Sequence, residues 1–290
     1  STLMERFDVL EKIQIDKNLN PDDVMVPIVE AVIPDVNGGY EYIAFVDSDD
    51  YIAPDMLENF HTAAEASFAD LTICGFYYTN EAKECSAYHV KYDPGIYHGE
   101  ALKAIAAESL DLVAPGNIRP FSWIRFVRKE CMEFPRLRFN TTVYRSEDYL
   151  IWNTLFARIK RLCLITDKPL YYYVTHQTSI THRYIENYWQ MAKTIYNELK
   201  TLYAGDIFAE QQLRIMLLRR AYMSLNIASR AESKKQFYRD IKTVLKDKDL
   251  HFIIRQIPFK EGVSADSVRY LLLKFRLYFI VKLMCIFKYS

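Results

Sequence analysis

The pattern of hydrophobic and polar positions predicts strands and helices in alternation along the first part of the chain. Residues 42–46 and 71–78 are apolar runs rich in β-branched and aromatic residues, as in buried strands. Between them, Pro54 stands at an expected first helical position, and apolar residues recur at helical spacing through residues 55–69. Strand, helix and strand in this order predict an α/β fold with a mostly parallel sheet.

The middle of the chain continues this alternation. Helices are expected near residues 99–110 and over residues 146–159. Two strands, 162–166 and 170–174, are expected to be interrupted by Pro169, which has no backbone N–H to donate.

The first forty residues carry weaker signals. Residues 4–10 favour a short helix, and residues 12–16 alternate like a short strand. Residues 17–39 favour no single element, apart from a turn at Gly38 and Gly39.

Long helical periodicities replace this pattern after residue 183. They cover residues 184–203, 206–229 and 233–247, with almost no Gly. We therefore expect an α/β domain over residues 1–183 and a helical C-terminal region over residues 184–290.

The charge balance, the cysteines and the apolar stretches of the chain limit which partners and which cell compartment are expected. The 37 Lys and Arg balance 37 Asp and Glu, so the formal net charge is zero and no whole-protein attraction to nucleic acid is expected. The five cysteines are scattered without C-x-x-C spacing, which predicts buried free thiols in a reducing compartment. No stretch has the roughly eighteen apolar residues of a membrane span, and the first residues lack the apolar core of a signal peptide. A cytoplasmic protein is expected.

Three acids follow directly on the apolar run at residues 42–46. Asp47, Asp49 and Asp50 would lie at the carboxyl edge of a sheet, where open α/β folds bind ligands. Hard oxygen ligands on a short loop suit Mg²⁺ or Mn²⁺, especially when substrate phosphates complete the coordination. The alternative is a turn that caps the helix beginning near Pro54. The residues alone favour neither interpretation.

Two further segments carry candidate chemistry. Glu147 and Asp148 follow a possible N-cap at Ser146, so they either oppose the helix dipole or provide a general base. Three tyrosines, residues 171–173, precede a hydroxyl-rich loop with two histidines. The tyrosines form either part of a core or a platform for a sugar ring. The histidines and hydroxyl groups of the loop could contact a phosphate or a metal.

Four stretches together resemble the family 2 glycosyltransferases of the GT-A fold, and most closely the bacterial enzymes of surface-polysaccharide synthesis. In order they are GGYEYIAFVDSDDYIAPDML, FSWIRFVRKECMEFPRLRF, RSEDYLIWNTLF and KPLYYYVTHQTSIT, within about residues 38–182. The resemblance implies inverting, metal-dependent transfer from a nucleotide-diphosphate sugar, a UDP-sugar foremost, to a glycan or lipid-linked acceptor.

The resemblance also implies roles for individual residues. Asp47 and Asp49 match the D-x-D that holds Mg²⁺ or Mn²⁺ against the diphosphate, and Asp148 matches the catalytic base, with Glu147 beside it. His176 stands where some members place a further metal or diphosphate contact. The residues expected to bind substrate are Asp50, Trp123, Tyr173 and Ser179.

The chain departs from the family before its acidic loop. Only about forty residues precede Asp47, and they contain no pattern that matches the family's nucleotide-binding half. The sequence leaves open a fragment, a shortened enzyme and a non-catalytic binding or assembly protein. A nucleotidyltransferase is disfavoured because no Gly-rich phosphate loop is present and the chain has eight Gly in all.

The C-terminal stretch, residues 267–290, is apolar and basic. It contains five Lys and Arg and no acid, but on a helix the cations do not gather on one face. It is either an imperfect interfacial helix or a helix docked on the protein core. Since a lipid-linked acceptor is met at a membrane, we expect peripheral contact with the inner membrane surface.

Overall fold

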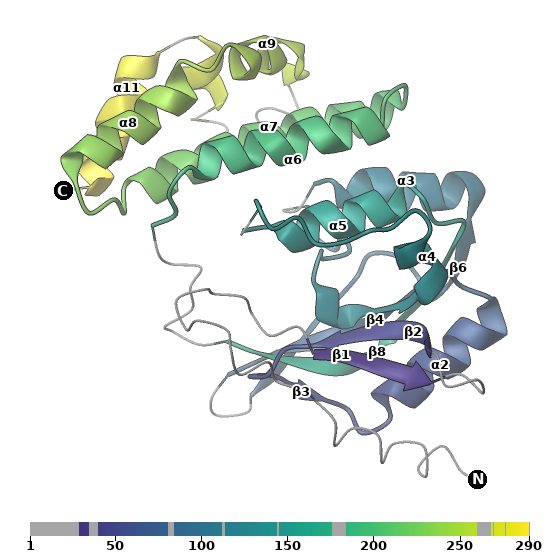
Figure 1. Ribbon diagram of the computed structural model, residues 1–290. Coiled ribbons are helices and arrows are strands. Elements are labelled where there is room, and N and C mark those ends of the chain that lie inside the picture. Colours follow the sequence, from purple (N-terminus) through teal and green to yellow (C-terminus); the bar gives the residue numbers. More distant parts are fainter. Residues whose placement is uncertain are drawn as a thin grey trace. The chain divides into compact units, whose positions relative to one another are not determined.

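The computed structural model describes residues 29–34, 40–80, 84–111, 114–143, 145–175, 184–259, 268, 270–275 and 277–289. The chain forms two compact units, each assembled from segments that are separated in the sequence. Figure 1 shows the course of the chain through the elements of both units.

The first unit is built on an eight-stranded sheet. Its strands are β1 (Val29–Pro34), β2 (Tyr40–Val46), β3 (Tyr51–Ile52), β4 (Leu71–Thr79), β5 (Cys85–Tyr88), β6 (Gly95–His98), β7 (Arg125–Arg128) and β8 (Arg161–Val174). The main order is β1-β2-β7-β4-β8-β3, while β5 pairs with β4 and β6 with β8. Helix α2 (Met56–Ser67) connects β3 to β4, and the short 3-10 helix η2 (Ser122–Ile124) and helix α4 (Lys129–Glu133) flank β7.

The directions of the strands correct the expected mostly parallel sheet. Only β4 and β8 pair in parallel, and the other six described pairings are antiparallel. Because β7 is antiparallel to both of its neighbours, β2, β4 and β8 still run in one direction. Their carboxyl ends therefore lie at the same edge of the sheet. Hydrophobic patterns identify strands but not the partners beside them.

The N-terminal predictions are tested only in part. The elements expected at residues 4–10 and 12–16, and the turn at Gly38 and Gly39, lie outside the described residues. Within the stretch that favoured no single element, β1 pairs antiparallel with β2.

Strand β8 is one strand of 14 residues rather than the two predicted. It pairs with β4 along its length, with a shift in register where Gly75 faces Pro169. A Cβ atom on Gly75 would lie 2.6 Å from the carbonyl oxygen of Thr166. Glycine therefore leaves room for the extra residues of β8 to bulge past β4. Pro169 changes the register without ending the strand.

Helix α2 confirms the prediction made from its apolar spacing. Met56, Phe60 and Ala64 are buried on one face, and the ring of Phe60 stacks on Phe126 of β7 with 5.2 Å between centroids. This packing fixes the helix against the sheet just after the acidic residues.

The second unit is helical. It contains α3 (Gly99–Ser109), α5 (Glu147–Phe156), α6 (Tyr188–Leu202), α7 (Ile207–Ala228), α8 (Lys234–Leu245), α9 (Lys248–Gln256) and α11 (Tyr278–Tyr289). The three long helices predicted after residue 183 are confirmed as α6, α7 and α8. Each of α7, α8 and α9 begins at a side-chain cap, made by Asp206, Ser233 and Asp247 respectively.

The helical unit does not begin at the single boundary expected near residue 183. Helices α3 and α5 precede that boundary in the sequence but pack with the C-terminal helices. Asn153 of α5 accepts a hydrogen bond from Ser109 at the end of α3 (2.7 Å) through its side chain. Its backbone carbonyl accepts one from Tyr203 at the end of α6 (2.9 Å). These contacts join residues far apart in the sequence, so no local composition change marks them.

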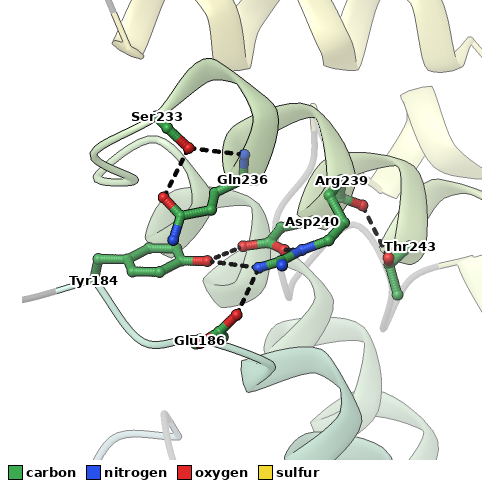
Figure 2. A network of polar contacts seen from close by, with 7 residues as sticks. All are labelled: Tyr184, Glu186, Ser233, Gln236, Arg239, Asp240 and Thr243. Atoms are coloured by element: carbon green, nitrogen blue, oxygen red, sulfur yellow. Dashed lines mark hydrogen bonds and ion pairs between the residues drawn. The ribbon is translucent and has the colours of Figure 1, made fainter.

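A polar network ties the segment before α6 to α8, as Figure 2 shows. The hydroxyl of Tyr184 donates to Asp240 (2.6 Å), and Arg239 donates to Glu186 (3.1 Å). Burial and the carboxylate of Asp240 raise the pKa of Tyr184 to about 12, so the phenol stays a donor at neutral pH. The network fixes the entry to α6.

All five cysteines are free thiols, as predicted, but their burial differs. Cys74, Cys163 and Cys285 are buried, Cys131 is half-buried and Cys85 is exposed. Burial raises the pKa of Cys74 to about 12, and burial together with Asp70 raises that of Cys131 to about 12. The thiolate is the reactive species, so these two thiols are held in an unreactive form.

Brief labelling of the native protein with a maleimide at neutral pH is therefore expected to modify Cys85 first. Peptide mass spectrometry would locate the label, and Cys85→Ser should remove the fast phase. In denaturant all five thiols should react. Equal rates of maleimide labelling at Cys74 and Cys85 in the native protein would contradict this order.

Candidate functional site

An acidic loop, residues 47–50, follows β2 at the carboxyl edge of the sheet. The backbone N–H of Asp50 donates to the carbonyl of Asp47 (3.2 Å), which closes a tight turn. The chain then enters β3, which pairs with β8, so the loop leads from β2 to a strand on the far side of β4. The N-cap residue of α2 is Asp55. The turn in the alternative interpretation is therefore confirmed, whereas its expected capping of the helix by the acids of this loop is wrong.

Asp50 holds the acidic loop on β8. Its carboxylate accepts hydrogen bonds from the hydroxyl of Tyr171 (2.8 Å) and from the backbone N–H of Val174 (2.7 Å). The same tyrosine oxygen accepts from the backbone N–H of Asp47 (3.0 Å). One half-buried carboxylate thus has a donor at each oxygen, which offsets the cost of removing it from water. Asp50 has a clear role in positioning the loop, and its contact with a donor sugar stays a prediction.

An aromatic stack formed by Phe121, Trp123, Tyr171 and Tyr173 lies beside this loop. The Trp123 ring is nearly parallel to Tyr171 (centroids 4.2 Å apart), Phe121 (4.7 Å) and Tyr173 (5.4 Å). Trp123 is only 3% exposed, whereas Tyr173 is half-buried. The structure gives Trp123 a packing role, and its predicted contact with substrate is not tested. Tyr173 is the member of the stack that combines exposure with a position near the acids.

Burial and the acids of the loop both affect the pKa of Tyr173. Burial raises this pKa, and the carboxylates of Asp50, Asp49 and Asp47 raise it further. Burial is also the largest cause of the raised pKa of Tyr171, whose hydroxyl donates to Asp50. Both phenols therefore remain protonated donors at neutral pH, in a region of concentrated negative charge. An anionic ligand would need a cation to bind there.

The side chains that could hold a cation fit Mg²⁺ or Mn²⁺. Asp49 is exposed and Asp47 half-buried, and both supply the hard oxygen ligands that these ions prefer. Within the described ranges no three His, Cys, Asp or Glu side chains form a metal-binding group. Two carboxylates are nevertheless a usual protein contribution to a Mg²⁺ site that substrate phosphates complete. His176 and Ser179 lie outside the described residues.

Glu147 and Asp148 belong to the second unit, in the first turn of α5. Ser146 occupies the expected N-cap position in a left-handed conformation (φ 67°), but its side chain makes no cap hydrogen bond. Its Oγ instead accepts from the guanidinium of Arg220 on α7 (3.2 Å). Both carboxylates are half-buried and oppose the positive end of the helix dipole. This placement is consistent both with stabilisation of the helix dipole and with a general base.

Arg220 is a residue that the sequence patterns did not single out. It is 3% exposed, donates to Ser146 and to the hydroxyl of Tyr188 (3.2 Å), and lies over the Tyr149 ring at 4.7 Å. Its Nη2 atom is buried without a hydrogen-bond partner. Ser146 and Tyr149, which Arg220 contacts, flank Glu147 and Asp148 in the sequence. The sequence places Arg219 and Arg220 side by side after the apolar residues 215–218 of α7, and this pattern does not mark Arg220 as the buried one.

Arg220→Met is expected to keep the free energy of unfolding within about 1 kcal/mol of wild type, because it removes a costly buried charge while filling the same space. Arg220→Ala should cost about 3 kcal/mol through the cavity it leaves. Urea unfolding of both variants provides the measurement. An equal loss of stability in both would show that the charge itself supports the fold.

Comparisons with known proteins place these features in context. No protein-family model matches the chain. From Bacillus subtilis (strain 168), "Uncharacterized glycosyltransferase EpsJ" is 24% identical over 255 residues, 83% of this chain and 71% of that protein. "Putative glycosyltransferase EpsH" from the same organism is 28% identical over 164 residues, 54% of this chain and 44% of that protein.

Solved structures give the fold. Crystal structures of S. aureus TarS 1–349 match at 17% identity, with UDP-GlcNAc (TM-score 0.54, 87% of this chain) and with UDP (TM-score 0.53, 86%). The chain has a glycosyltransferase fold. The expected resemblance and the GT-A-like α/β fold class are thereby confirmed. The chain spans 66% of the TarS 1–349 chain solved with UDP-GlcNAc.

Proposed function

We propose that this glycosyltransferase-like chain moves a sugar from a nucleotide-diphosphate sugar to a glycan or lipid-linked acceptor in cell-surface polysaccharide synthesis. The observation that carries the proposal is the acidic loop, which Asp50 holds on β8 beside Tyr173 at the carboxyl edge of the sheet. Similarity to EpsJ and EpsH supports sugar transfer, and the TarS structures with UDP and UDP-GlcNAc favour a UDP-sugar as donor.

In the proposed reaction the transfer is inverting and depends on Mg²⁺ or Mn²⁺. Asp47 and Asp49 would hold the ion, whose charge when bound stabilises the leaving diphosphate. Asp50 keeps the loop in place, and Tyr173 offers its ring and its protonated hydroxyl to the donor. His176 and Ser179 are proposed as further contacts to the donor.

Asp148 is the proposed general base, with Glu147 beside it. A carboxylate that accepts the acceptor's proton makes its hydroxyl oxygen a better nucleophile as the bond to the sugar forms. The nucleotide diphosphate leaves with the electron pair of the broken sugar–phosphate bond. Ser146 and Tyr149, on either side of the pair, are held by Arg220.

Turnover of UDP-, GDP- and CDP-sugars, measured as nucleoside diphosphate release with and without Mn²⁺, tests the proposal. One class of donor should be consumed, EDTA should abolish the reaction, and Asp49→Asn should reduce it strongly. Asp55→Asn, which alters an exposed acid a few residues away, is the matched control and should retain the rate. A rate that is insensitive to both EDTA and Asp49→Asn would contradict the assigned metal ligands.

A further inference from the structure

Helix α11 presents an apolar face to solvent. Phe279 is 73% exposed and Phe287 80%, while Ile280 and Met284 are about half as exposed (41% and 40%). At 100° per residue these four side chains fall within an arc of about 140° around the helix. Large apolar side chains gathered in this way are typical of an interaction surface rather than of scattered surface residues.

The opposite side of α11 is anchored on the helical unit. Val281 and Cys285 are buried, and α11 packs against α7. The ammonium of Lys282 lies 5.1 Å from the centroid of the Tyr238 ring on α8. Figure 1 shows α11 beside α8. The exposed face is therefore turned away from its own unit. The docked interpretation is confirmed for the other side of the helix, and contact with a membrane stays a prediction.

The charge of this region indicates what covers the apolar face. Lys282 is exposed and lies about 60° around the helix from Phe279. Residues 267–290 contain five Lys and Arg and no Asp or Glu. A second copy of the chain on the same face would bring like charges together, whereas anionic lipid headgroups would complement them.

The exposed apolar side chains of α11 lie along one side of the helix, which suits contact with a surface along the length of the helix. Among the residues that the structure describes, none of the helices meets the length and hydropathy needed to cross a membrane. Helices with an apolar face flanked by Lys or Arg are of the kind that bind in the plane of a lipid interface.

We propose that α11 docks the protein on a lipid surface that contains anionic phospholipids. Phe279 and Phe287 enter the acyl boundary, and Lys282 remains at the level of the headgroups. This inference does not depend on the proposed sugar transfer, because it concerns binding alone.

Flotation of the full chain with phosphatidylcholine vesicles, with and without phosphatidylglycerol, tests this docking. The wild type should float with the anionic vesicles and much less with the neutral ones. Phe279→Gln should weaken partitioning about tenfold, and the double variant with Phe287→Gln about 100-fold. Lys282→Gln should weaken it about fivefold on anionic vesicles only.

Phe68→Gln is the matched control, since Phe68 of the first unit is also 73% exposed, and it should bind as the wild type does. Absence of flotation with anionic vesicles would overturn the proposal, as would equal binding by wild type and the double Phe variant. Light scattering that shows a dimer lost in the double variant would assign the face to a second copy instead. Circular dichroism would show that the variants remain folded.

Discussion

Asp148→Asn is expected to lower kcat for sugar transfer by about 100- to 10,000-fold, with the KM for the donor little changed. The amide is nearly isosteric with the carboxylate, but it cannot take a proton from the acceptor hydroxyl. Asp148 is half-buried in the first turn of α5, and Asn is tolerated at such a position, so the helix should persist. Steady-state kinetics with the donor found active in the turnover assay provide the measurement.

Two further variants distinguish a general base from a carboxylate that only stabilises the start of the helix. Glu100→Gln alters the corresponding first-turn acid of α3 and should leave kcat unchanged. Glu147→Gln tests the neighbour of Asp148 and should have the smaller effect of the pair. If Asp148→Asn retains near-normal kcat while Glu147→Gln loses it, the roles are exchanged. If neither loses activity, the base lies elsewhere.

Trp123→Ala is expected to lower the free energy of unfolding by about 3–5 kcal/mol. The indole is 3% exposed and stacks with Phe121, Tyr171 and Tyr173, and its removal leaves a cavity that these rings cannot fill without moving. Because Tyr171 binds Asp50, the acidic loop should loosen as well. Denaturant unfolding followed by Tyr fluorescence or circular dichroism provides the measurement.

Trp123→Phe distinguishes packing from substrate contact. Phenylalanine keeps an aromatic ring in the stack, so about 1–2 kcal/mol should be lost and the donor KM should stay near that of the wild type. A large rise in KM at nearly unchanged stability would instead establish the direct substrate contact that the resemblance predicts.

The elements that the sequence predicted well are those that depend on neighbours in the chain. The apolar run ending at Val46 and the spacing of Met56, Phe60 and Ala64 are local, and both elements formed as expected. The insertion of β7 between β2 and β4 depends on residues about 50 or more positions away, and no periodicity encodes it. The bulge that Gly75 permits depends likewise on the path of β8 beside it.

For the candidate site too, the sequence predicted local features but not contacts between distant residues. The acids of the loop were found from their position after a strand, because carboxylates beside an apolar run are unusual. The bonds of Asp50 to Tyr171 and Val174 span more than 120 residues, and the contact of Arg220 with Ser146 spans 74. Such partners follow from tertiary packing, so a single sequence carries no signal that pairs them.

The acidic loop is proposed to bind a nucleotide-diphosphate sugar through a divalent cation. Calorimetric titration of the protein with UDP-GlcNAc in the presence of Mn²⁺, repeated with EDTA and with Asp49→Asn, measures this binding. We predict a micromolar Kd with Mn²⁺, no measurable heat with EDTA, and binding at least about tenfold weaker for the variant. An unchanged Kd without metal and in Asp49→Asn would contradict binding through a cation at this loop. The absence of binding by UDP-, GDP- and CDP-sugars alike would favour a non-catalytic relative that has lost the nucleotide site.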